Sequence, residues 1–510
     1  MLAKVNTIAF SGIDVQKVEI QVHVASGGLP AFNMVGMANK SVSESKERVR
    51  AAFASIGIGF PAKRITVNLA PADMMKDGSH FDLGIAIALL VAMGVIKTDE
   101  HKKYVVIGEL SLNGSITKVN GVLPAAIKAK ELELGLICPS DNAYEASLSD
   151  NEDILAPANL IDIINHLDGK NQIQSVKSED QDEQRYAEKY DLSDVRGQEL
   201  PKKALEIAAA GGHNLLMMGP PGTGKSMLAK RLNSILPPLT REEQLQVSII
   251  ASIVGMLDTA KGLVQRRPFR EPHSSSSMPA IVGGGKDAKP GEVTLAHNGV
   301  LFLDELPEFS KQALESLRQP LEAKNITIAR VNSHVTYPAN FQLIAAMNPC
   351  RCGYFNDNPT LKCRKAPLCA EDYQKRISGP LLDRFDMHVH VAPIKPSEIG
   401  VISNEKNDSE TSAEVLKRVV AARDIQSKRC EKLGTKMIIN AQLDGDLLKE
   451  SVKLDATAQK LLYTAVERFN LSMRGVNRVL RVARTIADLQ NSEDCTSTML
   501  AEALSYRWIT

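Results

Sequence analysis

The sequence predicts an α/β protein with a parallel-sheet core, an α+β domain before the core and a helical region after it. Three observations support this prediction. A glycine-rich loop stands between a short apolar run and a segment with helical spacing, a second apolar run ends in two carboxylates, and alternating strand patterns mark the N-terminal part. A chain of 510 residues is long enough for about two to four domains that each bury a core.

The N-terminal part alternates between strand and helix signals. Val18–Val24 and Ile65–Leu69 alternate apolar and polar residues, which predicts two half-buried strands. Between them, Ser41 and Glu44 have the spacing of a capping box, which predicts a helix that ends at Gly57. Two further helices are predicted, over residues 83–93 and 124–134.

These signals divide the chain into four parts. We expect a first domain over residues 1–168, followed by an acidic linker over 169–190 that lacks apolar periodicity. A second domain is expected over 191–395, with a cysteine-rich insert at 350–369, and helices over 396–510.

The glycine-rich loop is a phosphate-binding signature. The apolar run Asn214–Met218 precedes the pattern G-x-x-x-x-G-K-[ST], and helical spacing follows it. Glycine lets backbone N–H groups turn inward around a polyphosphate, the lysine reaches its β- and γ-phosphates, and the serine hydroxyl binds Mg²⁺. The sequence therefore predicts ATP and Mg²⁺ binding. The residues concerned are Gly219, Pro220, Pro221, Gly222, Thr223, Gly224, Lys225 and Ser226, with Met227 after them.

Two later strand ends supply the remaining catalytic groups. Val300–Leu303 is followed by Asp304 and Glu305, the Walker-B arrangement, in which the first carboxylate holds Mg²⁺ and the second polarises the attacking water. The run that ends at Met347 is followed by Asn348, whose amide can hold that water near the γ-phosphate.

Composition favours a cytoplasmic protein without a membrane segment. The net charge is +1, so contacts with nucleic acid must come from local basic clusters. The longest apolar run, Leu83–Ile96, contains two glycines and is too short to span a bilayer, and the N-terminus lacks the pattern of a signal peptide. The seven cysteines are an odd number, which favours metal binding or reduced thiols over a disulfide framework.

Four of the cysteines form a cluster with the spacing C-x-C-x10-C-x5-C. They are Cys350, Cys352, Cys363 and Cys369. Four thiolates in one short loop fit a tetrahedral Zn²⁺, whose binding would supply the folding energy of a loop without an apolar core. The spacing is not the common paired C-x2-C, so reduced cysteines or a redox role stay open.

The motifs together resemble a known family. The segment from Pro30 to Leu90 looks like the N-terminal domain of the magnesium-chelatase-like ComM/YifB AAA+ proteins, a domain similar in fold to the Lon protease domain. The motifs GPPGTGKS, LAHNGVLFLDELPEF, AAMNPCRCGY and RISGPLLDRFD extend the resemblance over essentially the whole chain.

The resemblance implies further site residues and a function. Val195 and Gly197 would flank the adenine, Arg384 would be an arginine finger given to a neighbouring subunit, and Arg474 would take the sensor-2 place near the γ-phosphate. The implied protein is a homohexameric ATPase that acts as a helicase on single-stranded or branched DNA and promotes branch migration during integration of transforming DNA. We expect Arg478 and Arg481 to form a solvated face.

Two stretches could contact DNA in a ring pore. Residues 266–289 combine basic residues with glycine and serine, and residues 324–334 predict a hairpin. Plain loop structure with scattered charge explains both stretches equally well.

Two other classes of function remain. A magnesium-chelatase motor subunit would act with a metal-adhesion partner, and this chain has no Asp-x-Ser-x-Ser motif of its own. A Lon-like protease or unfoldase would need a Ser–Lys pair. Ser79 lies in a different turn from the Lon serine, and Pro124 stands near the place of the lysine, so proteolysis is not expected.

Overall fold

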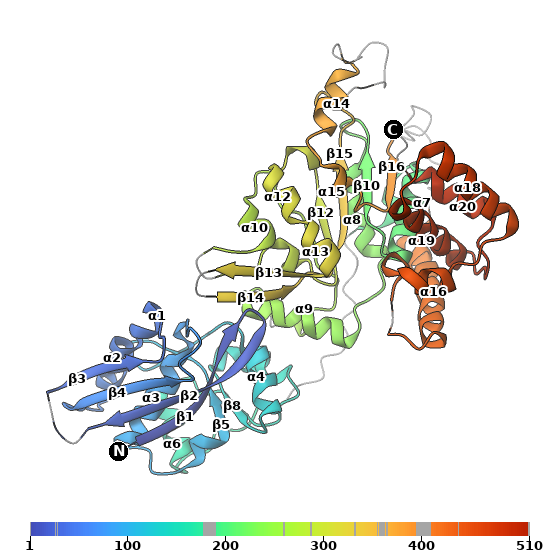
Figure 1. Ribbon diagram of the computed structural model, residues 1–510. Helices are drawn as coiled ribbons and strands as arrows, with labels where there is room; N and C mark the ends of the chain where they lie inside the picture. Colours follow the sequence, from blue (N-terminus) through green and yellow to red (C-terminus); the bar gives the residue numbers. More distant parts are fainter. Residues whose placement is uncertain are drawn as a thin grey trace, which may run out of the picture.

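The computed structural model describes residues 2–25, 27, 29–176, 190–258, 261–285, 288–330, 333–353, 355, 363, 366–393, 410–436 and 438–507. Most of the predicted acidic linker, residues 177–189, lies outside this described part, as do residues 394–409. Three bodies follow one another along the chain, coloured blue to teal, green to light orange, and orange to red in Figure 1. In the part that the structure describes, no helix is long and apolar enough to cross a membrane.

The first body is built on a seven-stranded mixed sheet in the order β3-β4-β2-β1-β5-β8-β9. Its strands are β1 (Leu2–Ser11), β2 (Asp14–Val24), β3 (Ala31–Val35), β4 (Arg64–Ala70), β5 (Tyr104–Val106), β8 (Gly135–Ile137) and β9 (Ile154–Leu155). Its helices are α1 (Lys40–Ser43), α2 (Ser45–Ser55), α3 (Asp82–Ala92), α4 (Val122–Glu131), α5 (Ala143–Ser147) and α6 (Leu160–Leu167). A short ladder joins β6 (Glu109–Leu110) to β7 (Ile116–Thr117). Helix α3 is buried over nearly its whole length, as its apolar sequence requires.

The predicted strands and helices of this body are confirmed, but the predicted capping box is wrong. Asn39, not Ser41, caps the first helix, through its side-chain contact with the N–H of Lys40. The Ser41 hydroxyl instead donates to Asp77 Oδ1 at 2.7 Å, a residue far away in the sequence. A tertiary partner has therefore taken the hydroxyl that local spacing assigned to the helix.

The second body is a five-stranded parallel sheet in the order β11-β12-β15-β10-β16. Its strands are β10 (Leu215–Met218), β11 (Phe269–Arg270), β12 (Val300–Leu303), β15 (Gln342–Met347) and β16 (Met387–His390). Its helices are α7 (Glu199–Gly211), α8 (Lys225–Ile235), α9 (Arg241–Ile253), α10 (Met278–Val282), α11 (Glu292–Leu295), α12 (Lys311–Ser316), α13 (Arg318–Ala323), α14 (Leu368–Gln374) and α15 (Gly379–Leu382). Strands β12 and β15 are buried throughout, as expected for strands covered on both faces.

The predicted hairpin before Asn348 is confirmed as β13 (Asn325–Arg330) and β14 (Ser333–Pro338), paired antiparallel. Its apolar side chains, including Ile326 and Val335, pack into the core on one face of the parallel sheet.

The third body is a helical lid. It consists of α16 (Ser412–Lys432), α17 (Gly445–Ser451), α18 (Ala456–Phe469), α19 (Met473–Leu489) and α20 (Ser497–Ser505). Helices α16 and α19 pack against α7, so the lid shares one hydrophobic core with the other face of the sheet. Figure 1 shows this arrangement to the right of the sheet.

The first body touches the second at α9. Helix α4 packs along α9, and Leu123, Leu257 and Leu263 form a small apolar cluster between the two bodies. The turn between β1 and β2 lies against β14, where a Cβ on Gly12 would come within 2.3 Å of Val335. The N-terminal domain is therefore in contact with both α9 and the β13–β14 hairpin.

Candidate active site

The phosphate-binding loop connects the end of β10 to the start of α8. Gly222 and Gly224 have φ angles of +77° and +89°, which a side chain would strain, so glycine is required at both positions. Helix α8 begins at Lys225, and its first N–H groups have no partner within the helix. The loop and helix end thus present backbone donors and a partial positive charge to a polyphosphate.

Lys225 is buried beneath this loop. Its Nζ donates to the carbonyl oxygens of Gly219 at 2.8 Å and Pro220 at 2.7 Å, and to Asn348 Oδ1 at 3.2 Å. Burial lowers the pKa of Lys225, although Asp304 and Glu305 act in the opposite direction. The lysine and the asparagine that the sequence predicted for this site are therefore in direct contact.

The Walker-B carboxylates lie next to the loop because β12 and β10 are both paired to β15. Ser226 Oγ donates to Asp304 Oδ2 at 2.6 Å. A serine hydroxyl and a carboxylate are hard oxygen ligands, so this pair fits Mg²⁺.

Glu305 lines a cavity that neither Ser226 nor Asp304 lines. Its backbone is left-handed, with φ of +51°, and its N–H donates to Asp304 Oδ1 at 2.9 Å. Its side chain faces a cavity of about 470 Å³ that is also lined by Asn348, Ser275 and Arg351. The two neighbouring carboxylates thus have different surroundings, an arrangement that fits Asp304 as a ligand of Mg²⁺ and Glu305 as the group that polarises water.

The segment expected to flank the adenine lies beside the loop. Val195 is buried, Gly197 has φ of +59°, and Gln198 Nε2 donates at 2.6 Å to the oxygen of Ala392, just beyond β16. Arg231 of α8 pairs with Asp194 at 3.1 Å. These contacts agree with the expected place of Val195 and Gly197, whose role in binding stays a prediction.

Arg384 and Arg474 lie at the other edge of the sheet. Both line a cavity of about 1010 Å³, here called the basic cleft, next to Asn214, Gln342 and Asp386. These three residues stand where β10, β15 and β16 begin, whereas the phosphate-binding loop follows the end of β10. Neither arginine lines the cavity that holds Glu305 and Asn348.

The basic cleft carries more positive than negative charge. Its cations are Arg267, Lys324, Arg384, Arg423, Arg474, Arg478 and Arg481, and its carboxylates are Glu243, Glu322, Asp386 and Asp444. Among the described residues, Arg384 Nε, Arg423 Nε and Arg478 Nη1 are buried without a hydrogen-bond partner. Burial lowers the pKa of Arg423 to about 10 and also lowers that of Arg478, and both stay charged at neutral pH. Other nitrogens of two of these arginines are bonded within the chain, Arg384 to Glu322 and Arg423 to the oxygen of Ala209. The excess of cations and the buried nitrogens without partners fit a polyanion.

The four clustered cysteines are together in space. Their sulfur atoms all lie within 4.8 Å of one another, with 3.2 Å between those of Cys350 and Cys352 and 2.7 Å between those of Cys363 and Cys369. Zinc–sulfur bonds of about 2.3 Å place tetrahedral ligands roughly 3.8 Å apart, so the donor set fits Zn²⁺. Most of the loop between Cys352 and Cys363 lies outside the described residues.

This cysteine cluster adjoins the catalytic loop. Cys350 is fully buried and comes two residues after Asn348. Gly353, at φ +84°, lies so close to Pro221 that a Cβ there would be 2.4 Å from the proline ring. Gln374 Nε2 donates to the oxygen of Pro349 at 3.0 Å. The cluster thus supports one wall of the nucleotide site.

Comparison with known proteins agrees with these features. Three family descriptions match in order: "Subunit ChlI of Mg-chelatase" over residues 19–142, "Magnesium chelatase, subunit ChlI" over 191–399 and "Magnesium chelatase, subunit ChlI C-terminal" over 409–507. The uncharacterized protein YifB of Escherichia coli K12 is 43% identical over 100% of this chain and 97% of its own. The competence protein ComM of Haemophilus influenzae is 42% identical over 99% of this chain and 97% of its own. The chain belongs to the ComM/YifB family of magnesium-chelatase-like proteins.

The more distant magnesium-chelatase subunit ChlI-2 of Arabidopsis thaliana is 22% identical over 56% of this chain and 65% of its own. As a member of this AAA+ family, the chain is an ATPase in general terms, and the family implies ATP and Mg²⁺ as its ligands.

Sequence reasoning missed the contacts that two lid arginines make within the chain. We expected Arg478 and Arg481 to form a solvated face, and this was wrong. Arg478 is only 6% exposed, and Arg481 Nε donates to the oxygen of Leu443 at 2.5 Å. Their spacing after Arg474 was visible, but the carboxylates that face Arg478 come from a distant segment.

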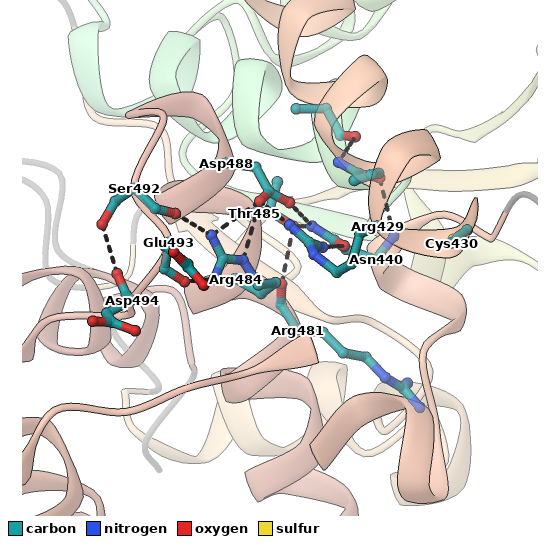
Figure 2. A network of polar contacts seen from close by, with 12 residues as sticks. Arg429, Cys430, Asn440, Arg481, Arg484, Thr485, Asp488, Ser492, Glu493 and Asp494 are labelled. Carbon is teal, nitrogen blue, oxygen red and sulfur yellow. Dashed lines mark hydrogen bonds and ion pairs between the residues drawn. The ribbon is translucent and has the colours of Figure 1, made fainter. Parts of the chain in front are cut away.

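The lid also contains a polar network that no motif predicted. Figure 2 shows Asp488 accepting hydrogen bonds from Arg429, Arg484 and Asn440. Asn440 also donates to Thr485 at 3.0 Å, and Thr485 in turn contacts Nε2 of His213 at 2.7 Å, just before β10. The network joins α16, α19 and the start of the central strand.

In the N-terminal domain, the serine expected for a Ser–Lys protease and the buried Lys76 each have other partners. The Ser79 hydroxyl donates to Glu109, and the ammonium of the buried Lys76 donates to the carbonyl oxygens of Pro71 and Met74. Pro124 is buried within α4. The likeness of this domain to the Lon protease domain stays a prediction.

Proposed function

We propose that this chain is an ATP-driven DNA translocase that works as a homohexameric ring and promotes branch migration during the integration of transforming DNA. One observation carries the mechanical part of the proposal. The groups that would bind and activate ATP lie at one edge of the sheet, and the arginines that would stabilise the transferred phosphate lie at the other. A single chain therefore contributes the nucleotide-binding groups to one active site and the arginines to another. A ring of identical chains brings the two kinds of group together at each contact between neighbours.

In this scheme, each catalytic group has a separate task. The loop N–H groups and Lys225 hold the phosphates, Ser226 and Asp304 hold Mg²⁺, and Glu305 polarises water that Asn348 positions. Arg384 and Arg474 of the neighbouring chain neutralise the charge that develops on the transferred phosphoryl group. Arg474 thereby keeps the sensor-2 role implied by the resemblance, but it serves the neighbour's nucleotide and not its own.

DNA as substrate is supported by the similarity to the competence protein ComM and by the β13–β14 hairpin, which follows the basic cleft directly at Lys324. In the other candidate stretch, the arginines are engaged within the domain. Arg267 pairs with Glu243 at 3.0 Å and Arg270 with Glu292 at 2.6 Å. The hairpin is therefore the better candidate for gripping a phosphate backbone.

Rates of ATP hydrolysis measured without DNA, with single-stranded DNA and with a forked duplex test this proposal. Stimulation by DNA, strongest with the fork, supports the translocase. Stimulation by an unfolded protein alone points to an unfoldase, and stimulation only by a tetrapyrrole-enzyme partner points to a chelatase motor. Electron microscopy with an ATP analogue and forked DNA tests the hexamer.

A further inference from the structure

Arg478 connects the segments that carry Arg384 and Arg474, two of the other arginines that line the basic cleft. It lies on α19 one helical turn after Arg474, and residues at this spacing share one face of a helix. Its Nη1 is 3.6 Å from Asp383 Oδ1, and its Nε is 3.7 Å from Asp386 Oδ1. These two carboxylates stand on either side of Arg384 in the sequence, so one guanidinium spans the segment that carries the other arginine.

The segment around Arg384 is also fixed from the central strand. Asn214 Nδ2 donates to the Arg384 carbonyl oxygen at 2.9 Å, and the Asn214 N–H donates to Asp386 Oδ2 at 3.0 Å. His213 Nδ1 lies 3.7 Å from the same carboxylate oxygen. Through Thr485, His213 is connected to the network around Asp488 that Figure 2 shows. Hydrogen bonds therefore connect the lid core to His213 and connect Asn214 to the Arg384 segment, and the two sets approach each other between His213 and Asp386.

Arg478 is held between two carboxylates by charge and not by hydrogen bonds. Both ion pairs are too long for hydrogen bonds, and Nη1 is buried without a hydrogen-bond partner among the described residues. Hydrophobic residues often replace a buried ion pair without loss of stability, so stability alone is a weak reason for this arginine. A need to fix the position of the Arg384 segment relative to α19 is a stronger reason for this arginine.

Resting on the proposed function, we propose that Arg478 is a positioning residue that couples Arg384 to Arg474, so that both meet the triphosphate of the neighbouring chain together. Arg478 acts through these two residues and does not itself touch the nucleotide. Its loss would let the Arg384 segment and the start of α19 move independently, which weakens stabilisation of the transferred phosphate but leaves the chain's own nucleotide loop intact.

The first test replaces Arg478 with Met and measures steady-state ATP hydrolysis with forked DNA. We expect kcat to fall about 10–100-fold while KM for ATP stays within about twofold, because the lost group serves only the transition state. Mixing with Lys225→Ala protein should restore hydrolysis, since that protein supplies intact arginines to the neighbouring nucleotide. Arg418→Met is the matched control: Arg418 also joins a lid helix to the core, pairing with Glu206 at 2.5 Å and Glu410 at 2.7 Å, but outside the cleft. It should hydrolyse ATP at the normal rate.

The second test combines Arg478→Met with Arg384→Ala. If Arg478 acts through Arg384, the double variant should be at most about threefold slower than Arg384→Ala alone. Arg478→Lys should restore part of the rate, since its charge is kept although its fork is lost. For the case in which Arg478→Met does not fold, Asp383→Asn removes one of the two carboxylates at a half-exposed position and should give the same separation of kcat from KM, to a smaller extent.

Several results would overturn this inference. They are a normal kcat in Arg478→Met or in Asp383→Asn, a loss that multiplies fully with that of Arg384→Ala, and a failure of Lys225→Ala protein to restore hydrolysis. If Arg384→Ala is inactive while Arg478→Met is normal, only the positioning role falls. If Arg384→Ala itself hydrolyses ATP at full rate, the shared site of the proposed function falls together with it.

Discussion

The two edges of the parallel sheet differ in how their charged groups are satisfied. At the edge with the phosphate-binding loop, Lys225 has three hydrogen-bond acceptors, and Ser226 and Asp304 are bonded to each other. At the edge with the basic cleft, Arg384 Nε and Arg478 Nη1 are buried without hydrogen-bond partners among the described residues, although another nitrogen of Arg384 pairs with Glu322. The first edge is complete as a binding site within one chain. The second keeps more cations than carboxylates even after pairs such as Arg384 with Glu322 and Arg481 with Asp444 have formed. This excess of positive charge favours a partner that brings a polyanion.

The largest effect on ATP hydrolysis is expected from variants at the edge with the phosphate-binding loop, here called the loop edge. Lys225→Ala removes the charge beneath the phosphates and should abolish ATP binding, and Glu305→Gln should bind ATP but not hydrolyse it. We expect each to lower kcat by about 10⁴-fold or more, because electrostatic stabilisation or water activation is lost from a preorganised site. Equilibrium binding of a fluorescent nucleotide, together with phosphate release, separates the two variants. Normal turnover by either would remove this edge from the catalytic site.

The next largest effect on ATP hydrolysis is expected at the edge with the basic cleft, here called the cleft edge. Arg384→Ala should bind ATP with near-normal affinity but hydrolyse it about 10³-fold more slowly, as is typical when an arginine finger is removed. The two edges are complementary only if they come from different chains. Mixed with Lys225→Ala protein, which is inactive by itself, Arg384→Ala should therefore regain a measurable part of the normal rate. No recovery over a range of mixing ratios would mean that the cleft does not act on a neighbour.

A smaller effect is expected from the cysteine cluster, which supports the loop edge only. Replacing both Cys350 and Cys363 with Ser should remove about one zinc ion per chain, measured by elemental analysis of purified protein. Hydrolysis should fall about tenfold, because the loop next to Pro221 and Asn348 loses the metal that organises it. Cys430→Ser is a matched control, since Cys430 is buried in the lid far along the chain from this loop. Wild-type protein purified without any bound metal would contradict the zinc site.

The sequence predicted the loop edge far better than the cleft edge, for a physical reason. Gly224, Lys225 and Ser226 are consecutive, and Asp304 and Asn348 each end an apolar run, so local pattern and parallel pairing were enough to bring them together. The basic cleft is built from side chains whose partners lie far away in the sequence, such as Arg478 with Asp386. Burial of such an arginine depends on which loop faces its helix, and periodicity along α19 does not contain that information. The same limit explains the capping box, where Ser41 bonded to the distant Asp77.

The smallest effect on ATP hydrolysis is expected at the contact between α9 and the N-terminal domain, away from both edges of the sheet. Helix α9 begins at the basic cleft, which Thr240 and Glu243 line, and it ends against the first domain at Ser252. Ser252 Oγ donates at 2.5 Å to Glu145, a buried carboxylate that also accepts from the N–H of Leu123 at 3.2 Å and from Asn142 at 2.9 Å. Ser252→Ala leaves that carboxylate with one donor fewer, which should cost about 1–3 kcal/mol of stability. For a domain of this size, each 1 kcal/mol lowers Tm by about 2–4 °C.

Neither edge of the sheet is changed by this substitution, so ATP hydrolysis should stay within about twofold of normal. Hydrogen exchange should quicken at the contact between α4 and α9, where the Gly121 N–H donates to the oxygen of Ser252 at 3.1 Å. Ser147→Ala is the matched control, because its hydroxyl donates to the oxygen of Tyr144 at 2.8 Å, a contact that lies within the first domain. Equal exchange in both variants would show that this hydrogen bond does not hold the domains together. A large loss of hydrolysis in Ser252→Ala would instead extend the catalytic machinery along α9, beyond the two edges compared above.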